Sequence, residues 1–237
     1  MTDPFFRSDP YARSCRTTVT RLAEDGALVV GASVFYPAGG GQPGDTGWID
    51  GPDGRLEVID TRKEGATEVA LVLEPGASVP EGAEIEMHLD WDRRYRHMRV
   101  HTALHLLSVV IPLPVTGGAI GAEKGRLDFD MPEAPADKEA LEAALNALIA
   151  RDLAVTTQWI TDAEMAANMD LVKTMSVAPP MGQGRVRLVR IGTADEQIDL
   201  QPCGGTHVAS TAEIGRVTLG KIEKKGKQNR RVSLLLA

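Results

Sequence analysis

Two short pairs of potential metal ligands, about 100 residues apart, constrain most strongly what this sequence can fold into. The first pair has the pattern HxxxH and the second has the pattern CxxxH. If all four side chains bind one ion, the fold must bring two distant segments of the chain to one point. The four residues are His101, His105, Cys203 and His207.

The first pair lies in the segment DRRYRHMRVHTALHLLSVVI, whose apolar residues recur with a helical period. His101 and His105 are four residues apart, so a helix would place both imidazoles on one face, one turn from each other. A single HxxxH pair is also typical of histidines that merely flank a core. This pair therefore needs the second one to indicate a metal site.

The second pair lies in the segment PCGGTHV, in which Gly204 and Gly205 separate the cysteine from the histidine. Two glycines predict a sharp turn that would let both side chains converge. A thiolate and an imidazole are ligands that zinc prefers. A glycine-rich turn with a buried cysteine is the structural alternative. Three of the five histidines and one of the two cysteines belong to the pairs, which favours a shared zinc ion.

The surroundings of the pairs narrow the chemistry. A metal-bound histidine usually donates its second ring nitrogen to a carboxylate or a carbonyl group. Asp128 and Asp130, in a strand-like alternating segment, are candidates for that role. The residue after His101 is Thr102, so the glutamate base of an HExxH motif is missing. This argues against a metalloprotease of that class.

The hydrophobic pattern changes near Asp92. Before it, short alternating segments separated by turn-rich stretches predict a small barrel or a strongly bent sheet. After it, helical patterns come early and strand patterns late, with Asp92 and Asp137 as candidate N-caps of two helices. We therefore expect an α+β protein, with an N-terminal small β-barrel domain at 1–90 and an α+β domain carrying the zinc site at 91–237.

Composition excludes several classes of protein. The net charge of −7 argues against a broadly basic surface for nucleic acid, so any such contact must be local. Two cysteines are too few for a disulfide scaffold, which favours a reduced, cytoplasmic setting. We expect no membrane span, because no run of about 18 apolar residues occurs. The AGGGQPGDTG loop lacks the Gly-Lys-Ser/Thr ending of a phosphate loop, so we expect no nucleotide cofactor.

Several motifs together carry a resemblance to a known family. The segments RHMRVHTALHLL, VTGGAIG, PCGGTHV and IGRVTLGKIEKKGKQNRR resemble the editing domain of alanyl-tRNA synthetase. They resemble still more closely the free-standing AlaX-type alanyl-tRNA editing proteins, in their medium-length form. The loop GGGQPGDTG is similar to the glycine-rich loop of that family's N-terminal barrel. The resemblance implies a zinc-dependent hydrolase that removes serine or glycine from wrongly charged tRNA for alanine.

The resemblance also implies roles for particular residues. A pocket that selects alanine rejects serine by only about 10²-fold, so a second site must recognise the serine hydroxyl. The family carries a pocket-lining residue near Thr116, which makes Thr116 the candidate catalytic-site partner of that hydroxyl; the alternative is an ordinary turn residue. The glycine-rich loop faces the pocket in the family, which implies pocket roles for Gly40, Gln42 and Asp45.

Two basic clusters flank the metal motifs, and we expect them to contact tRNA phosphates. The alternative is that they are solvated strand ends. The candidates are Arg93, Arg94, Lys221, Lys224, Lys225, Lys227, Arg230 and Arg231.

Three interpretations of the function stay open at this point, of which the first is the zinc-dependent editing hydrolase. In that case four protein ligands would fill a tetrahedral site, so the zinc ion must expand its coordination, lose a ligand or only position the substrate. A non-catalytic RNA-binding module with structural zinc would carry the same residues. So would an editing hydrolase for another aminoacyl-tRNA, such as threonine tRNA charged with serine.

Overall fold

The computed structural model describes residues 1–174, 182 and 184–237. Its internal contacts divide the chain into two compact units, Met1–Arg96 and His97–Ala237. The division falls within one helix, α2 (Trp91–Val110). The functional domain limits of 1–90 and 91–237 stay a prediction.

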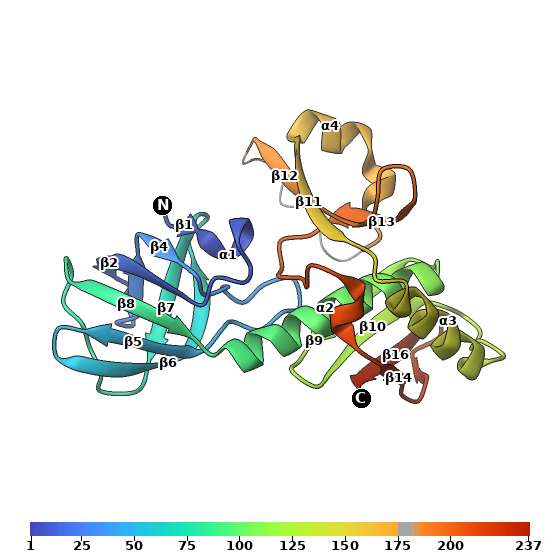
Figure 1. The fold of residues 1–237 in the computed structure, drawn as a ribbon, viewed down its shortest axis with the longest axis horizontal. Helices are drawn as coiled ribbons and strands as arrows, with labels where there is room; N and C mark the ends of the chain where they lie inside the picture. Colours follow the sequence, from blue (N-terminus) through green and yellow to red (C-terminus); the bar gives the residue numbers. More distant parts are fainter. Residues whose placement is uncertain (175–181, 183) are drawn as a thin grey trace. The chain divides into compact units, whose positions relative to one another are not determined.

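The first unit is built around a closed β-barrel, drawn in blue to cyan in Figure 1. A short helix, α1 (Phe5–Ser8), and a parallel pair, β1 (Asp3–Pro4) with β4 (Ala32–Ser33), complete the unit. In their order around the barrel, the strands are β2 (Ser14–Leu22), β3 (Leu28–Val30), β7 (Glu68–Leu73), β6 (Gly54–Glu64), β5 (Gly47–Gly51) and β8 (Glu84–Leu89).

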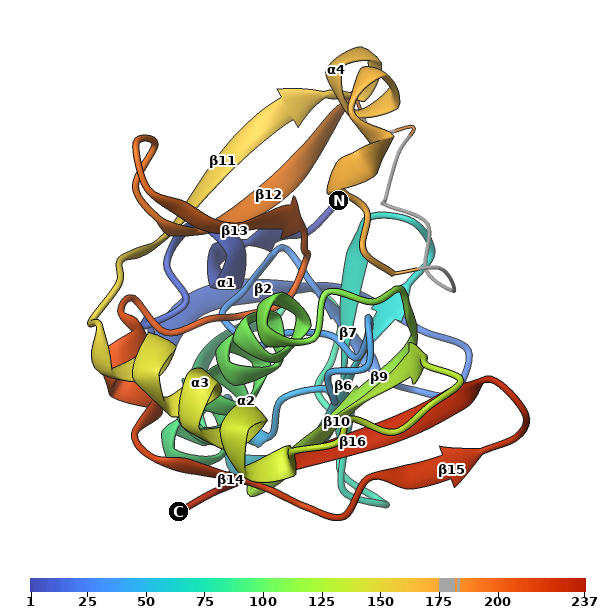
Figure 2. The ribbon, with the colours of Figure 1, turned by 90° about the vertical axis from the view of Figure 1, so that its right-hand side faces the viewer.

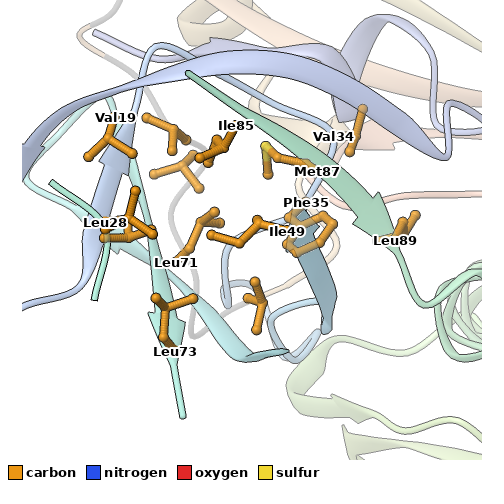
Figure 3. Packing of buried hydrophobic residues seen from close by; sticks show 14 of the residues in the cluster. Val19, Leu28, Val34, Phe35, Ile49, Leu71, Leu73, Ile85, Met87 and Leu89 are labelled. Carbon is orange, nitrogen blue, oxygen red and sulfur yellow. The ribbon is translucent and has the colours of Figure 1, made fainter. Parts of the chain in front are cut away.

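Strand alternation explains the core of this barrel. In β8, the side chains of Ile85, Met87 and Leu89 are buried, and the residues between them are more exposed. Because successive side chains of a strand point to opposite faces, one face of β8 lines the interior. Figure 3 shows Ile85 and Met87 directed toward Ile49, and all three belong to one buried cluster with Leu28 and Leu89. The predicted small N-terminal barrel is confirmed.

The second unit combines helices with two antiparallel sheets. The larger sheet has the order β14-β16-β10-β9, with β15 also paired to β16, and the smaller sheet has the order β11-β12-β13. The strands are β9 (Val115–Ile120), β10 (Lys124–Asp130), β11 (Val155–Thr161), β12 (Arg185–Gly192), β13 (Gln197–Pro202), β14 (Val217–Leu219), β15 (Glu223–Lys225) and β16 (Asn229–Leu236). The helical elements besides α2 are α3 (Lys138–Ala150), α4 (Asp162–Ala167) and the 3₁₀ turns Met169–Leu171 and Thr211–Ile214. The predicted α+β class is confirmed.

Helix α2 packs closely on the larger sheet, and Figure 2 shows α2 and α3 on the same face of it. Gly125 in β10 makes the close approach possible. A Cβ added at Gly125 would lie 2.5 Å from Val100 Cγ1 and 2.9 Å from Leu104 Cδ1, both on α2. Since real Cβ atoms do not approach so closely, this glycine sets the distance between the sheet and the helix that carries the first histidine pair.

The start of α2 differs from the sequence prediction. Asp90, not Asp92, caps the helix, because the Asp90 carboxylate accepts a hydrogen bond from the backbone N–H of Arg93 at 3.1 Å. Asp92 lies in the first turn, where a negative charge still favours the helix. Asp137 caps α3 as predicted, accepting from the backbone N–H of Ala140. Within the described residues, no helix is long and apolar enough to cross a membrane.

Candidate metal centre

Helix α2 positions the first pair of candidate ligands. His101 and His105 stand one turn apart with their ring centroids 5.2 Å from each other. Both side chains are buried, as are Val100 and Leu104, through which the helix packs on β10. The helical spacing predicted from the sequence therefore holds, and the apolar packing fixes the direction in which the two imidazoles point.

The loop after β13 carries the second pair, and an arginine holds its shape. The buried Arg187 guanidinium donates to the carbonyl oxygens of Cys203 and Gly205 at 2.9 and 3.0 Å. The backbone N–H of Cys203 donates in turn to the Arg187 carbonyl at 3.1 Å. Gly204 and Gly205 keep φ outside the left-handed region, and a Cβ on Gly204 would meet open space. The predicted convergence of the two side chains is present, and Arg187, which sequence reasoning missed, helps to hold the loop.

The four candidate ligand atoms converge within 4.8 Å of one another. The Cys203 Sγ atom lies 3.4 Å from His101 Nε2 and 3.6 Å from His207 Nε2. His207 Nε2 and His105 Nε2 are 3.2 Å apart. The four residues could hold a metal ion.

Three of these separations, 3.4, 3.6 and 3.2 Å, are close to those of tetrahedral coordination. Zn–S and Zn–N bonds of about 2.3 and 2.05 Å at tetrahedral angles place sulfur about 3.6 Å from nitrogen and two nitrogens about 3.3 Å apart. A site for calcium or magnesium would need oxygen ligands. The sulfur–nitrogen donor set and these three separations therefore suit a thiolate-binding ion.

The protonation of the cluster also suits a metal. Burial opposes ionisation of Cys203, but His101 and His207 outweigh it and hold the pKa of this thiol well below its ordinary value. Burial and the charge of His101 lower the pKa of His207 to about 3, so this ring is neutral. Burial also lowers the pKa of His105, but the bond to Asp199 outweighs it and raises that pKa to about 9. Metal binding would therefore release a proton from His105.

Asp199 orients His105 from behind. Its Oδ2 atom lies 2.9 Å from His105 Nδ1 and accepts a bond from Gln201 Nε2 at 2.8 Å, while Oδ1 pairs with Lys173 Nζ at 2.5 Å. Burial opposes the ionisation of Asp199, but the bond to His105 prevails and lowers the pKa of the carboxyl to about 2. An anionic partner on Nδ1 leaves Nε2 free to face the cluster.

The sequence prediction for this outer partner was wrong. Asp128 instead accepts from Arg126 and Arg231, and the partner of His105 is Asp199 rather than Asp128 or Asp130. A signal was present in the sequence: Asp199, Gln201 and Cys203 alternate along one strand and its end. Alternate residues of a strand share a face, so a carboxylate at that spacing from a ligand was a candidate.

Thr116 lies on β9 with a half-buried side chain, and its hydroxyl donates to the Asp128 carbonyl at 3.1 Å. The oxygen keeps acceptor capacity for one further donor. Its predicted role toward a serine hydroxyl stays a prediction.

The glycine-rich loop belongs to the first unit. Gly40, at φ +58°, and Gly41, at φ +81°, form its exposed tip between Gly39 and Gln42, which bond to each other across the turn. Gln42 is buried. The pocket roles predicted for this loop stay predictions.

Asp45 in the same loop forms a buried ion pair with Arg94, with Nε 2.9 Å from Oδ2. The Arg94 guanidinium also donates to the carbonyl oxygens of Val34 and Pro10. Its side chain is 0% exposed, so it cannot meet a phosphate, and the predicted tRNA contact of Arg94 is wrong. The sequence alone does not indicate whether a charged residue in the first turn of a helix is buried or exposed.

The remaining basic candidates differ in their hydrogen-bond partners and in their exposure to solvent. Arg93 is half-buried and donates to the Gly44 carbonyl at 2.6 Å. Arg231 pairs with Asp128 at 2.8 Å and Arg230 donates to the Pro132 carbonyl at 2.7 Å. Exposed lysines lie on and beside the β15–β16 hairpin: Lys221, Lys224, Lys225, which pairs with Glu223, and Lys227.

Comparison with known proteins adds independent evidence. Residues 186–233 match the family described as "Threonyl and Alanyl tRNA synthetase second additional domain", and residues 13–93 match "tRNA synthetases class II (A)". The chain is 33% identical over 247 residues to the alanyl-tRNA editing protein AlaX-M of Methanosarcina barkeri, covering 100% of this chain and 99% of the relative.

Two longer relatives match as well. The AlaX-L editing protein of Pyrococcus horikoshii is 30% identical over 240 residues, which are 96% of this chain and 56% of the relative. The alanine–tRNA ligase of Pyrobaculum neutrophilum is 34% identical over 232 residues, which are 94% of this chain but 25% of the ligase.

Proposed function

Because this chain belongs to the AlaX family of alanyl-tRNA editing proteins, we propose that it hydrolyses the ester bond of tRNA for alanine that carries serine or glycine. Water adds to the ester carbonyl, the ribose oxygen leaves as a hydroxyl group, and the products are the free amino acid and uncharged tRNA. The observation that carries the proposal is the convergence of four candidate ligand atoms within 4.8 Å of one another, in a chain that matches AlaX-M along its whole length. We place the reaction in the cytoplasm, where charged tRNA is used.

We propose zinc as the ion, held by His101, His105, Cys203 and His207, since one thiolate and three imidazoles are a zinc-type donor set. When bound, zinc would polarise the ester carbonyl and lower the pKa of a nearby water from about 15.7 to about 7. Other side chains of the protein position the candidate ligands. Asp199 keeps the His105 ring in the tautomer whose Nε2 faces the cluster.

Selectivity requires that serine be removed and alanine spared. Thr116 supports this task, because its hydroxyl oxygen can accept a hydrogen bond from a serine side chain while donating to the Asp128 carbonyl. Alanine would leave that acceptor unpaired, at a cost of about 1–3 kcal/mol. We also propose that the exposed lysines Lys221, Lys224 and Lys227 contact phosphates of the tRNA.

The test is deacylation of purified tRNA for alanine charged with serine, glycine or alanine, before and after dialysis against a chelator. We expect loss of serine or glycine, retention of alanine, and loss of activity with the metal. Tight tRNA binding without deacylation would refute the proposal in favour of a binding module. Faster release of serine from threonine tRNA would instead assign the substrate to the threonine system.

A further inference from the structure

Lys173 lies behind the candidate metal centre, on the far side of Asp199 from His105. Its Nζ atom is 2.5 Å from Asp199 Oδ1, and Asp199 Oδ2 is 2.9 Å from His105 Nδ1. The far side of that ring, Nε2, faces His207 at 3.2 Å. One carboxylate and one imidazole therefore separate the ammonium from the ligand atoms, so Lys173 is beside the centre but is not a ligand.

The backbone of Lys173 is held next to the strand that carries Thr116. The backbone N–H of Val115 donates to the Lys173 carbonyl at 3.0 Å, and Val115 also forms a parallel bridge with Thr174. Thr116 is the next residue along β9. Lys173 therefore contacts, through its backbone, the strand that carries the proposed serine-recognition residue and, through its side chain, the residue that orients His105.

Burial and charge distinguish the two ends of this ion pair. The side chain of Asp199 is 0% exposed, whereas that of Lys173 is 30% exposed. An ammonium group carries three hydrogens, and Asp199 Oδ1 takes one of them. Among the described residues, Asp199 is the acidic partner of Lys173. The lysine is therefore fixed at one point and still open to solvent, as a binding group for an anion would be.

We propose that Lys173 is a substrate-binding residue that contacts the phosphate of the terminal nucleotide of the charged tRNA. This inference rests on the proposed function. An ester that reacts at the cluster brings with it the phosphate of its own nucleotide, which is the nearest anion along the substrate. An ammonium separated from the ligand atoms by one carboxylate and one imidazole is suited to that phosphate rather than to the ester carbonyl. By holding the phosphate, Lys173 aims the ester at the cluster.

The test uses a non-hydrolysable probe, the 3′-seryl-amide analogue of adenosine, with and without a 5′-phosphate. Binding of each form to the metal-loaded protein is measured by calorimetry. We expect the phosphate to strengthen binding to the unchanged protein about tenfold. Lys173→Met should lose this gain while keeping its metal content, Lys173→Arg should keep most of it, and the exposed control Lys124→Ala should keep all of it.

A second measurement needs no variant. Acylation of Lys173 by a soluble active ester is followed by mass spectrometry in the unchanged protein. The phosphorylated analogue should protect Lys173, and the unphosphorylated analogue should protect it much less. Equal protection by both forms, no gain from the phosphate, or a gain that survives in Lys173→Met would each overturn the inference. Serine release from charged tRNA by the unchanged protein separately tests the proposed function.

Discussion

Replacing Arg94 with methionine should destabilise the barrel unit rather than weaken tRNA binding directly. The Arg94 side chain is fully buried, and its guanidinium holds the Asp45 carboxylate and two backbone carbonyl groups. Methionine fills much of the same volume but leaves the buried Asp45 carboxylate without its counter-charge. Removing one member of a buried ion pair costs about 3–5 kcal/mol.

The double variant Arg94→Met, Asp45→Asn distinguishes the energy of the ion pair from that of the other contacts of the two residues. It removes both charges, while the amide oxygen of asparagine can still accept from the backbone N–H of Tyr36, as Asp45 does. We therefore expect the double variant to lose about 2–3 kcal/mol less free energy of unfolding than the losses of the two single variants added together. The matched surface control is Arg16→Met, whose partner Glu86 lies 3.3 Å away across an exposed pair and should matter by less than about 1 kcal/mol.

The assay is equilibrium unfolding in urea, followed by far-ultraviolet circular dichroism, together with the salt dependence of tRNA binding. A loss below about 1 kcal/mol for Arg94→Met would refute the reasoning. So would strictly additive losses in the double variant. A salt slope reduced by about one, with stability unchanged, would restore Arg94 as a phosphate contact.

Three further predictions concern the second unit. Cys203→Ala should abolish metal binding, measured as metal content by mass spectrometry. The control Cys15→Ala should leave that content unchanged. A full metal complement in Cys203→Ala would count against the site. Gly125→Ala should lower the free energy of unfolding in urea by about 1–3 kcal/mol, because the added Cβ overlaps α2. Gly204→Ala, whose Cβ meets open space, should lower it by less than about 0.5 kcal/mol. The reverse ranking would contradict the close packing of α2 on β10. The bonds from its two arginines lower the pKa of Asp128 below the ordinary value of about 3.9. Its contribution to stability is therefore complete above about pH 4 and lost as the pH falls through the folded-state pKa. Asp128→Asn should flatten this acid limb of stability, and an unchanged limb would exclude the mechanism.

The sequence was sufficient to predict the cluster of four candidate ligands, because helical spacing and residue chemistry act over a few positions. His101 and His105 share a helical face for a purely local reason. The barrel was also accessible, since alternation such as that of Ile85 and Met87 reports a one-sided strand. These are the features that short-range geometry determines.

What the sequence could not provide depends on long-range packing. Asp199 meets His105 across 94 residues and Arg187 reaches the carbonyl of Gly205 across 18, and neither pairing follows from spacing. The inward direction of Arg94 depends on carbonyl groups of Val34 and Pro10, which only the folded barrel brings there. Charge in a sequence was therefore a poor guide to which arginines remain available to RNA.

The separation of His101 from Cys203, 102 residues along the chain, has a consequence for folding. A bound ion would join these distant positions as a reversible cross-link, in a chain whose two cysteines are both free. For a disulfide that closes a loop of about 100 residues, restriction of the unfolded chain is worth about 4.7 kcal/mol. Metal supply would therefore govern not only turnover but the lifetime of the folded second unit, so that a metal-starved cell would lose the protein itself as well as its activity.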